Sequence, residues 1–186
     1  MQKYLLHSRP RLVTLVVGSS LKERLYMTRA VFAGSFDPFT NGHLDMVKKA
    51  SKIFDEVTVV IASNANKKRK TNAEEMRQAI KDCLDRMNLT NCKVDICTGL
   101  LGKYCIDNNI GYNVRGLRSN GDYEYEEMLA RGNNEIDPYL ETIYLRTKNS
   151  TISSSLVREF FFYGEDVSAY IPPESLEVMN RALAAE

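Results

Sequence analysis

A ten-residue string near the start of the chain combines residue types that bind phosphate. Residues 34–43 read GSFDPFTNGH and lie between an apolar run at Ala30–Ala33 and a helical pattern that begins at Leu44. Glycines let a ligand approach the backbone closely, and the amides that open a helix favour an anion. His43 can donate a hydrogen bond to a phosphoryl oxygen on which negative charge develops. The full string predicts a phosphate site, whereas a shorter match such as GH alone would be interpreted as a tight turn with a half-exposed histidine.

Two further polar segments follow expected strands. Arg115 and Arg118, in the string RGLR, come directly after an expected strand and can converge on one polyphosphate through bidentate hydrogen bonds. The string ISSSLVR at 152–158 places consecutive hydroxyls at a helix start, where they form an anion cradle or only a helix cap. Asp37 lies beside a proline in a turn, and we interpret it as structural rather than as a general base.

The basic run Lys67–Lys70 follows the β-branched run at 57–62. Such a run is often a solvated loop, but this one leaves the carboxyl end of an expected strand and can therefore reach a ligand. Lys67 is the residue expected to do so, while Lys68, Arg69 and Lys70 are expected to matter much less. The phosphate-loop string GxxxxGK[ST] and the dinucleotide string GxGxxG are both absent from the sequence.

Short apolar runs alternate with helical periodicity from Arg29 onward. Five strands are expected, at 30–33, 57–62, 94–97, 112–114 and 142–145. Helices are expected from Leu44 to Phe54, from a capping box of Thr71 with Glu74 to Met87, and at 101–108, 122–136, 153–160 and 176–183. This alternation predicts a doubly wound, five-stranded parallel sheet in a single α/β domain at 27–186. Ligands bind such sheets at the carboxyl ends of the strands.

Composition limits the classes of partner. The formal net charge of the 186 residues is +1, so no strong field points to nucleic acid or to a membrane surface, and no apolar run approaches a membrane span. With two histidines and four cysteines in no common zinc spacing, we expect no protein metal site and reduced, structural thiols in a cytoplasmic protein. Residues 1–26 are basic and faintly resemble a targeting segment, but we expect a dispensable extension that precedes Met27.

The three strings GSFDPFTNGH, RGLR and ISSSLVRE together resemble the bacterial phosphopantetheine adenylyltransferases of the nucleotidyltransferase superfamily. The resemblance extends over about residues 28–183, and Thr40 takes the place of the first histidine in the superfamily string HxGH. It implies a Rossmann-like nucleotidyltransferase fold, a homohexamer, and the transfer of AMP from ATP to 4′-phosphopantetheine. The products would be dephospho-coenzyme A and pyrophosphate, with Mg²⁺ bound to the polyphosphate.

The resemblance also implies a role for individual residues. His43 would stabilise the transition state and bind ATP. The other ATP-binding residues would be Ser35, Phe36, Gly116, Leu117, Arg118, Glu126, Asn149, Ser150, Thr151, Ile152, Ser153, Ser154 and Ser155. The acceptor would be bound by Ser35, Lys67, Leu101 and Arg115.

Two other kinds of function stay open at this point. One is a sister enzyme that adenylylates nicotinamide mononucleotide, or a cytidylyltransferase that acts on a phosphorylated alcohol. The other is a nucleotide-sensing module without catalysis, which would have little use for a transition-state donor such as His43.

Overall fold

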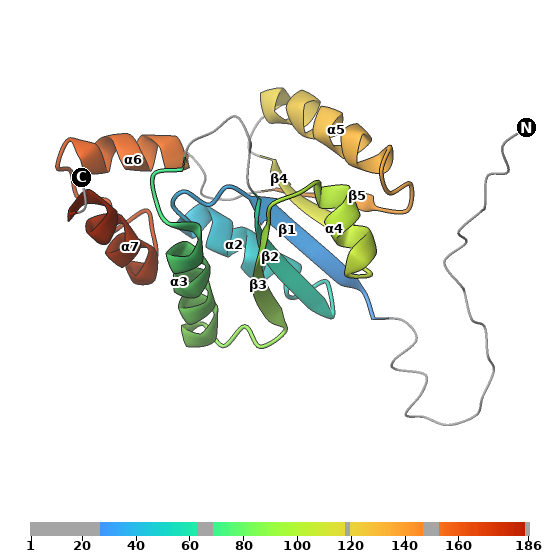
Figure 1. Ribbon diagram of the computed structural model, residues 1–186, viewed down its shortest axis with the longest axis horizontal. Coiled ribbons are helices and arrows are strands. Elements are labelled where there is room, and N and C mark those ends of the chain that lie inside the picture. The colour runs from blue at the N-terminus through green and yellow to red at the C-terminus, as the bar shows by residue number, and fades with distance from the viewer. Residues whose placement is uncertain (1–26, 63–68, 118–119, 147–152, 185–186) are drawn as a thin grey trace, which may run out of the picture.

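The computed structural model describes residues 27–62, 69–117, 120–146 and 153–184 (Figure 1). Strands and helices alternate along this part of the chain. The strands are β1 (Arg29–Gly34), β2 (Glu56–Ala62), β3 (Cys92–Cys97), β4 (Tyr112–Leu117) and β5 (Glu141–Arg146). The helices are α2 (Asn41–Ala50), α3 (Ala73–Arg86), α4 (Leu101–Asp107), α5 (Asn120–Asn134), α6 (Ser154–Phe162) and α7 (Pro173–Ala184).

The strands form one parallel sheet in the order β3-β2-β1-β4-β5. Ala30 of the central strand β1 is in register with Val57 of β2 on one side and with Tyr112 of β4 on the other. The predicted five-stranded parallel sheet is therefore confirmed. Because the chain proceeds outward from β1 to β3 and then returns to place β4 beside β1, the strand order reverses between β1 and β4. Ligands bind at such a reversal, outside the carboxyl ends of the strands.

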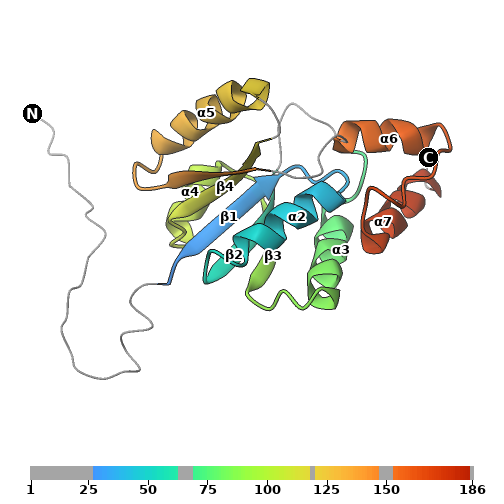
Figure 2. The same ribbon diagram turned by 180° about the vertical axis from the view of Figure 1, so that it is seen from behind.

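Helices cover both faces of the sheet, as Figures 1 and 2 show. Successive residues of β1 point to opposite faces. Ala30 and Phe32 belong to the apolar cluster that contains the buried residues of α2 and α3, whereas Val31 and Ala33 belong to a second cluster that contains Cys105 of α4. The doubly wound arrangement predicted from the alternation of elements is thus confirmed, and α5 lies with α4 on the second face.

The predicted capping box at the start of α3 is wrong. Asn72, not Thr71, caps this helix, and its side-chain oxygen accepts from the amides of Glu74 at 2.9 Å and Glu75 at 3.1 Å. Thr71 instead donates from Oγ1 to Asp37 Oδ1 at 2.7 Å. The Thr71 hydroxyl, which the local pattern had assigned to the helix cap, therefore bonds to a residue that is distant in the sequence.

The string RGLR does not begin after the fourth strand, as the sequence suggested. Arg115, Gly116 and Leu117 are still part of β4, where they are in register with Tyr144, Leu145 and Arg146 of β5. Pairing with β5 prolongs a strand whose own apolar signal ends at Val114.

The last two helices form a separate apolar cluster beside the sheet. The cluster buries Val157 of α6, Met179 of α7, and Ile171, which precedes α7. Two ion pairs join α7 to α3, one between Arg86 and Glu174 and the other between Arg181 and Glu75. This contact brings α6 to the carboxyl edge of the sheet (Figure 1).

The four cysteines form no disulfide in the part of the chain that the structure describes. Burial raises the pKa of the Cys83 thiol to about 11, and it does the same for Cys92. These thiols therefore stay protonated at neutral pH, which fits the structural role expected of them. None of the described helices combines the length and apolar character needed to cross a bilayer. Residues 1–26 lie outside the described residues, so the division of the chain at Met27 stays a prediction.

Candidate active site

His43 is oriented by the helix that it begins. It is the third residue of α2, and Thr40 is the N-cap. The Thr40 amide donates to His43 Nδ1 at 3.0 Å, and the His43 amide donates to Thr40 Oγ1 at 3.4 Å. The two residues thus form a capping box in which a histidine stands where glutamate or glutamine is usual. Because Nδ1 accepts from a backbone amide, the proton of the neutral ring lies on Nε2, which can donate to a ligand.

Three phenyl rings surround the imidazole. The ring centroid of His43 lies 5.0 Å from that of Phe36, 5.6 Å from that of Phe39 and 6.3 Å from that of Phe32. Phe36 is 2% exposed, so its side chain is part of the core rather than a surface on which a base could stack. Its contact with a ligand is therefore limited to what the cavity exposes, and its main effect is to fix the His43 ring.

His43 lies in the wall of a cavity of about 250 Å³ at the carboxyl ends of β1 and β4. The cavity brings together segments that are far apart in the sequence. The residues predicted from the sequence that line this cavity are Ser35, Phe36, His43, Arg115, Gly116, Glu126, Ser153 and Ser154. Its lining also includes Gly34 and Gly42, at which the sequence analysis expected close approach of a ligand, and Phe32, Ala33, Thr40 and Met46, for which it proposed no ligand contact. For Ala33 and Thr40, position at a strand end and at a helix start was the sequence signal that could have found them.

Two helix N-termini meet at this cavity. Thr40 and Ser153, the N-caps of α2 and α6, both line it. The N-terminal end of a helix carries a partial positive charge, so the two helices together favour a polyanion. Not all of their amides are available, because Asn41 N donates to Tyr170 O at 2.8 Å and His43 N donates to Thr40.

Arg115 connects three elements at the wall of the cavity. Its Nε and Nη2 donate to the Glu126 carboxylate of α5, the second bond measuring 2.8 Å, and its Nη1 donates to Ala33 O of β1 at 2.7 Å. The two side chains are only 20% and 13% exposed. The pair is therefore held in place before any ligand binds, and a phosphate would meet an arginine whose charge Glu126 partly offsets.

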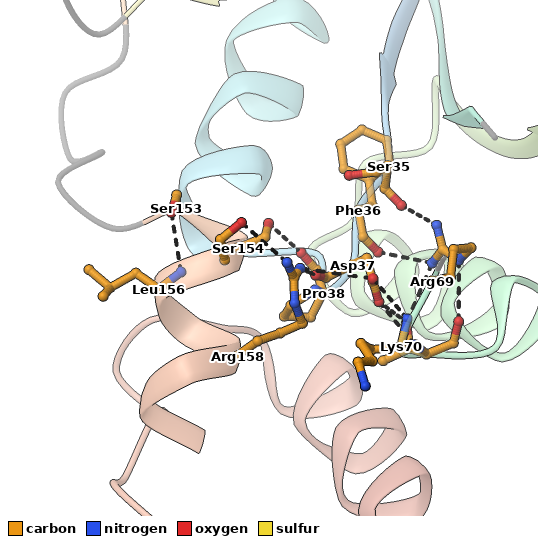
Figure 3. A network of polar contacts seen from close by, with 12 residues as sticks. Ser35, Phe36, Asp37, Pro38, Arg69, Lys70, Ser153, Ser154, Leu156 and Arg158 are labelled. Atoms are coloured by element: carbon orange, nitrogen blue, oxygen red, sulfur yellow. Dashed lines mark hydrogen bonds and ion pairs between the residues drawn. The ribbon is translucent and has the colours of Figure 1, made fainter. Parts of the chain in front are cut away.

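The hydroxyl groups of Ser153, Ser154 and Ser155 all form hydrogen bonds within the protein. Ser153 Oγ accepts from Leu156 N at 3.2 Å, which confirms Ser153 as the cap, and Ser154 Oγ donates to Pro38 O at 2.9 Å (Figure 3). Ser155 is exposed and accepts from Arg158 Nη2 at 3.2 Å, and it does not line the cavity. Two of the three serines therefore line the cavity, and the role expected of Ser155 stays a prediction.

The remaining predicted residues fall into two groups. Leu101 is half-buried against the cluster of Val31 and Cys105, and Leu117 ends β4; neither lines the cavity. The other group lies outside the described residues: Lys67, Arg118, Asn149, Ser150, Thr151 and Ile152. The roles expected of both groups stay predictions.

The sequence analysis missed a polar network beneath the site. Asp37 is buried, and its carboxylate accepts from the amides of Lys70 and Thr71, both at 3.0 Å, and from the Thr71 hydroxyl. Its structural interpretation is therefore confirmed. Arg69 was expected to lie on a solvated loop, but it is half-buried and donates to the carbonyls of Ser35 and Phe36 (Figure 3). No local pattern links residues more than thirty positions apart, so only the fold could reveal these contacts.

Gly34 has a packing role in addition to the one expected of it. A Cβ on this residue would lie 2.8 Å from Cε1 of Phe36. The glycine therefore makes room for the phenyl ring that packs on His43. It also lines the cavity, and the close approach of a ligand that the sequence suggested stays a prediction.

No cluster of three or more His, Cys, Asp or Glu side chains that could hold a metal occurs in the described part of the chain. Magnesium in nucleotide sites is usually held by phosphate oxygens and water with only one or two carboxylates. The donors present therefore fit an ion that arrives with a nucleotide. A separate cavity of about 310 Å³, lined by α6, α7 and the residues before α3, includes none of the predicted site residues in the described ranges.

The sequence profile of the cytidylyltransferase-like family matches residues 31–160 of this chain. The phosphopantetheine adenylyltransferase of Thermotoga neapolitana is 42% identical over 156 residues, which cover 83% of this chain and 96% of the relative. That of a Nocardioides species is 43% identical over 162 residues, which cover 86% and 99%.

Two solved structures share the fold at lower identity. One is assigned to a nicotinate-nucleotide adenylyltransferase of Vibrio parahaemolyticus, with a TM-score of 0.63 and 21% identity over 87% of this chain and 97% of that one. The other is a bifunctional NMN adenylyltransferase/ADP ribose pyrophosphatase of Francisella tularensis, with a TM-score of 0.61 and 16% identity over 83% of this chain and 52% of that one. The similarity to the curated relatives over nearly their whole length places this chain in the phosphopantetheine adenylyltransferase family, which is the family that its three strings resemble.

Proposed function

We propose that this chain transfers AMP from ATP to 4′-phosphopantetheine and releases dephospho-coenzyme A and pyrophosphate. The observation that carries the proposal is an identity of 42–43% to phosphopantetheine adenylyltransferases over nearly their whole length. The cavity at the ends of β1 and β4, with His43 in its wall, would be the site of this chemistry.

In this reaction an oxygen of the acceptor phosphate attacks the α-phosphorus of ATP. One phosphorus–oxygen bond forms, and the bond to the bridging oxygen between the α- and β-phosphorus breaks, so that pyrophosphate leaves with the electron pair. A phosphate monoester is already ionised at neutral pH, and therefore the site needs no strong base. This fits a cavity in which His43 has its proton on Nε2 and acts as a donor.

The chain contributes orientation and charge stabilisation. His43 Nε2–H would donate to a phosphoryl oxygen whose charge grows in the transition state, while the N-termini of α2 and α6 favour the polyphosphate. Ser35 and Arg115 would bind the acceptor, with Lys67 and Leu101. The nucleotide would contact Phe36, Gly116 and Glu126, and the segment from Asn149 to Ser155.

Mg²⁺ would enter with ATP and offset the charge of its phosphates. Cytoplasmic location, the absence of a nucleic-acid partner and a homohexameric assembly belong to the same proposal. Apolar side chains exposed on α5 support self-association; they are Tyr123, Tyr125, Met128 and Leu129. Light scattering of the purified chain would report six chain masses if the assembly is hexameric, and a single chain mass would contradict this part of the proposal.

A coupled pyrophosphate-release assay tests the reaction. ATP is supplied with 4′-phosphopantetheine, nicotinamide mononucleotide or nicotinate mononucleotide, and CTP with phosphocholine serves as a further pair. We expect release with phosphopantetheine alone, and mass spectrometry should identify dephospho-coenzyme A. Turnover of a mononucleotide but not of phosphopantetheine would contradict the proposal, and binding of ATP without any turnover would favour a sensing module.

A further inference from the structure

Every carbonyl group in the segment from Ser35 to Pro38 accepts a hydrogen bond from a side chain that lies elsewhere in the sequence. Four consecutive carbonyl oxygens accept hydrogen bonds from side chains of other segments: those of Ser35, Phe36, Asp37 and Pro38. Arg69 donates to the first two, Arg158 to the third and Ser154 to the fourth. Figure 3 shows the segment between Arg69, which precedes α3, and Arg158, which belongs to α6.

The Arg69 guanidinium is itself fixed. Its Nε donates to Thr71 O at 3.2 Å and its Nη2 donates to Thr71 Oγ1 at 3.4 Å, in addition to the bonds from Nη1 to Ser35 O and from Nη2 to Phe36 O at 3.3 Å. Burial lowers the pKa of Arg69, while the Asp37 carboxylate opposes this effect. The planar fork of an arginine can hold two neighbouring carbonyls at once, which the single ammonium of a lysine cannot do in the same geometry.

These bonds set the direction of two peptide groups beside the cavity. In a trans peptide the carbonyl oxygen and the amide hydrogen point to opposite sides. With the Ser35 and Phe36 carbonyls turned toward Arg69, the amides of Phe36 and Asp37 point away from it. Ser35 and Phe36 line the cavity, and the Phe36 ring lies 5.0 Å from the ring of His43. Any rotation of this segment would therefore move the Phe36 ring against the His43 ring.

We propose that Arg69 is a positioning residue of the active site. It holds the Ser35–Phe36 main chain, and through the Phe36 ring it fixes the place of His43, although it does not line the cavity itself. This inference rests on the proposed function for its kinetic consequence, but the geometric part does not depend on the substrate. Asp37 ties the same segment to Thr71 independently. A variant that lacks the Arg69 side chain can therefore keep the fold while the segment loses its orientation.

The test uses the full chain with Arg69→Ala and Arg69→Lys, and with Arg77→Ala as a matched control, since Arg77 forms an exposed ion pair with Glu74. We expect Arg69→Ala to lower kcat by roughly 10- to 100-fold, because small displacements of reacting groups have effects of this order. Arg69→Lys should lose nearly as much, and Arg77→Ala should match the wild type. Methylguanidinium should restore part of the activity of Arg69→Ala, whereas methylammonium should not.

A second measurement is independent of turnover. The chain has two histidines, His7 and His43, so the imidazole signals of His43 can be assigned by nuclear magnetic resonance with a His7→Gln variant. Arg69→Ala should shift these signals, and methylguanidinium should move them back.

Three results would overturn the proposal: unchanged kcat in Arg69→Ala, unchanged His43 signals, or a loss that follows the unfolded fraction and that methylguanidinium does not relieve. If the wild-type chain shows no adenylyltransferase activity but the His43 signals respond as expected, the proposed function fails and the positioning by Arg69 stands.

Discussion

At the scale of single residues, the site depends on how its side chains are held. His43 receives a hydrogen bond on Nδ1 from the Thr40 amide, and this bond leaves Nε2 as the donor. Phe36 and Phe39 fix the plane of its ring. A donor that is already oriented needs no reorganisation when charge develops on the substrate.

Replacement of His43 by alanine should therefore reduce turnover more than binding. We expect His43→Ala to lower kcat by about 10²–10³-fold while the affinity for ATP stays within about tenfold, because a donor to developing charge acts mainly in the transition state. Steady-state kinetics and calorimetric titration with ATP would measure the two effects. An unchanged kcat with a matching loss of ATP affinity would assign His43 to ground-state binding instead.

Replacement of Gly34 by alanine should destabilise the protein. The added methyl would lie 2.8 Å from the Phe36 ring, and overpacking of this kind costs about 1–3 kcal/mol of unfolding free energy. Gly111→Ala is the control, because nothing lies within 4 Å of the position that its Cβ would occupy.

The double variant Gly34→Ala, Phe36→Leu tests the cause. It should be less destabilised than the sum of the two single variants, since the smaller side chain gives way to the methyl. Strict additivity in urea denaturation would show that the Phe36 ring is not what excludes a side chain at position 34.

At the scale of elements, α7 is joined to α3 by ion pairs at both ends of the contact. Arg86 Nε and Nη2 donate to the Glu174 carboxylate at 2.6 and 3.2 Å, and Arg181 Nε donates to Glu75 Oε2 at 2.8 Å. Because α7 packs with α6 in one apolar cluster, this contact also determines where α6 presents Ser154 to the cavity.

The pair of Arg86 with Glu174 should make a contribution to stability that depends on pH. Hydrogen bonds from Arg86 lower the pKa of Glu174 below its ordinary value of 4.5. A carboxyl whose pKa is depressed in the folded state stabilises the protein above its unfolded pKa, and this contribution is lost as the pH falls through the folded pKa. Arg86 is half exposed, so we expect a coupling of only about 0.5–1 kcal/mol at pH 7.

A double-mutant cycle of Arg86→Met and Glu174→Gln would measure this coupling. It should be constant from pH 7 to about 5 and should decrease below pH 4.5, toward the lowered folded pKa. A coupling that grows on acidification would contradict the assigned pair.

At the scale of the whole molecule, the strand order determines where the site lies. β1 and β4 are hydrogen-bonded neighbours in the sheet although 82 positions of the chain separate Ala30 from its partner in register, Tyr112. Their carboxyl ends, together with the N-termini of α2 and α6, form one cavity. The buried residues of the described apolar clusters lie between Ala30 and Met179.

A chain that starts at Met27 should therefore fold and remain active. We expect the truncated protein to keep the thermal unfolding temperature and the pyrophosphate-release rate of the full chain, because the sheet and its covering helices are built from residues that follow Met27. Differential scanning calorimetry and the coupled assay would compare the two proteins. Insolubility of the truncated chain, or a large drop in its unfolding temperature, would show that residues 1–26 contribute to the fold.

The sequence by itself determined the elements and much of the site. Apolar periodicity predicted all five strands, and the buried faces of α2 and α3 were as expected at Leu44, Val47, Met76 and Ile80. The three polar strings contain seven of the predicted site residues that the structure brings to one cavity, because polar residues at strand ends and helix starts have few structural reasons to be there; Glu126 came only from the family resemblance. These patterns are local, and local patterns follow from the periods of helix and strand.

Only the tertiary structure decided which partners the polar groups take. Thr71 donates to Asp37, so Asn72 caps the helix instead. Arg115 forms an ion pair with Glu126. Arg69, which the sequence placed in a solvated run, donates to the carbonyls of Ser35 and Phe36. Each of these contacts joins segments between 11 and 34 residues apart or competes with a local bond. A buried polar group must find a partner wherever the fold supplies one, and the sequence does not reveal which distant group will be nearest.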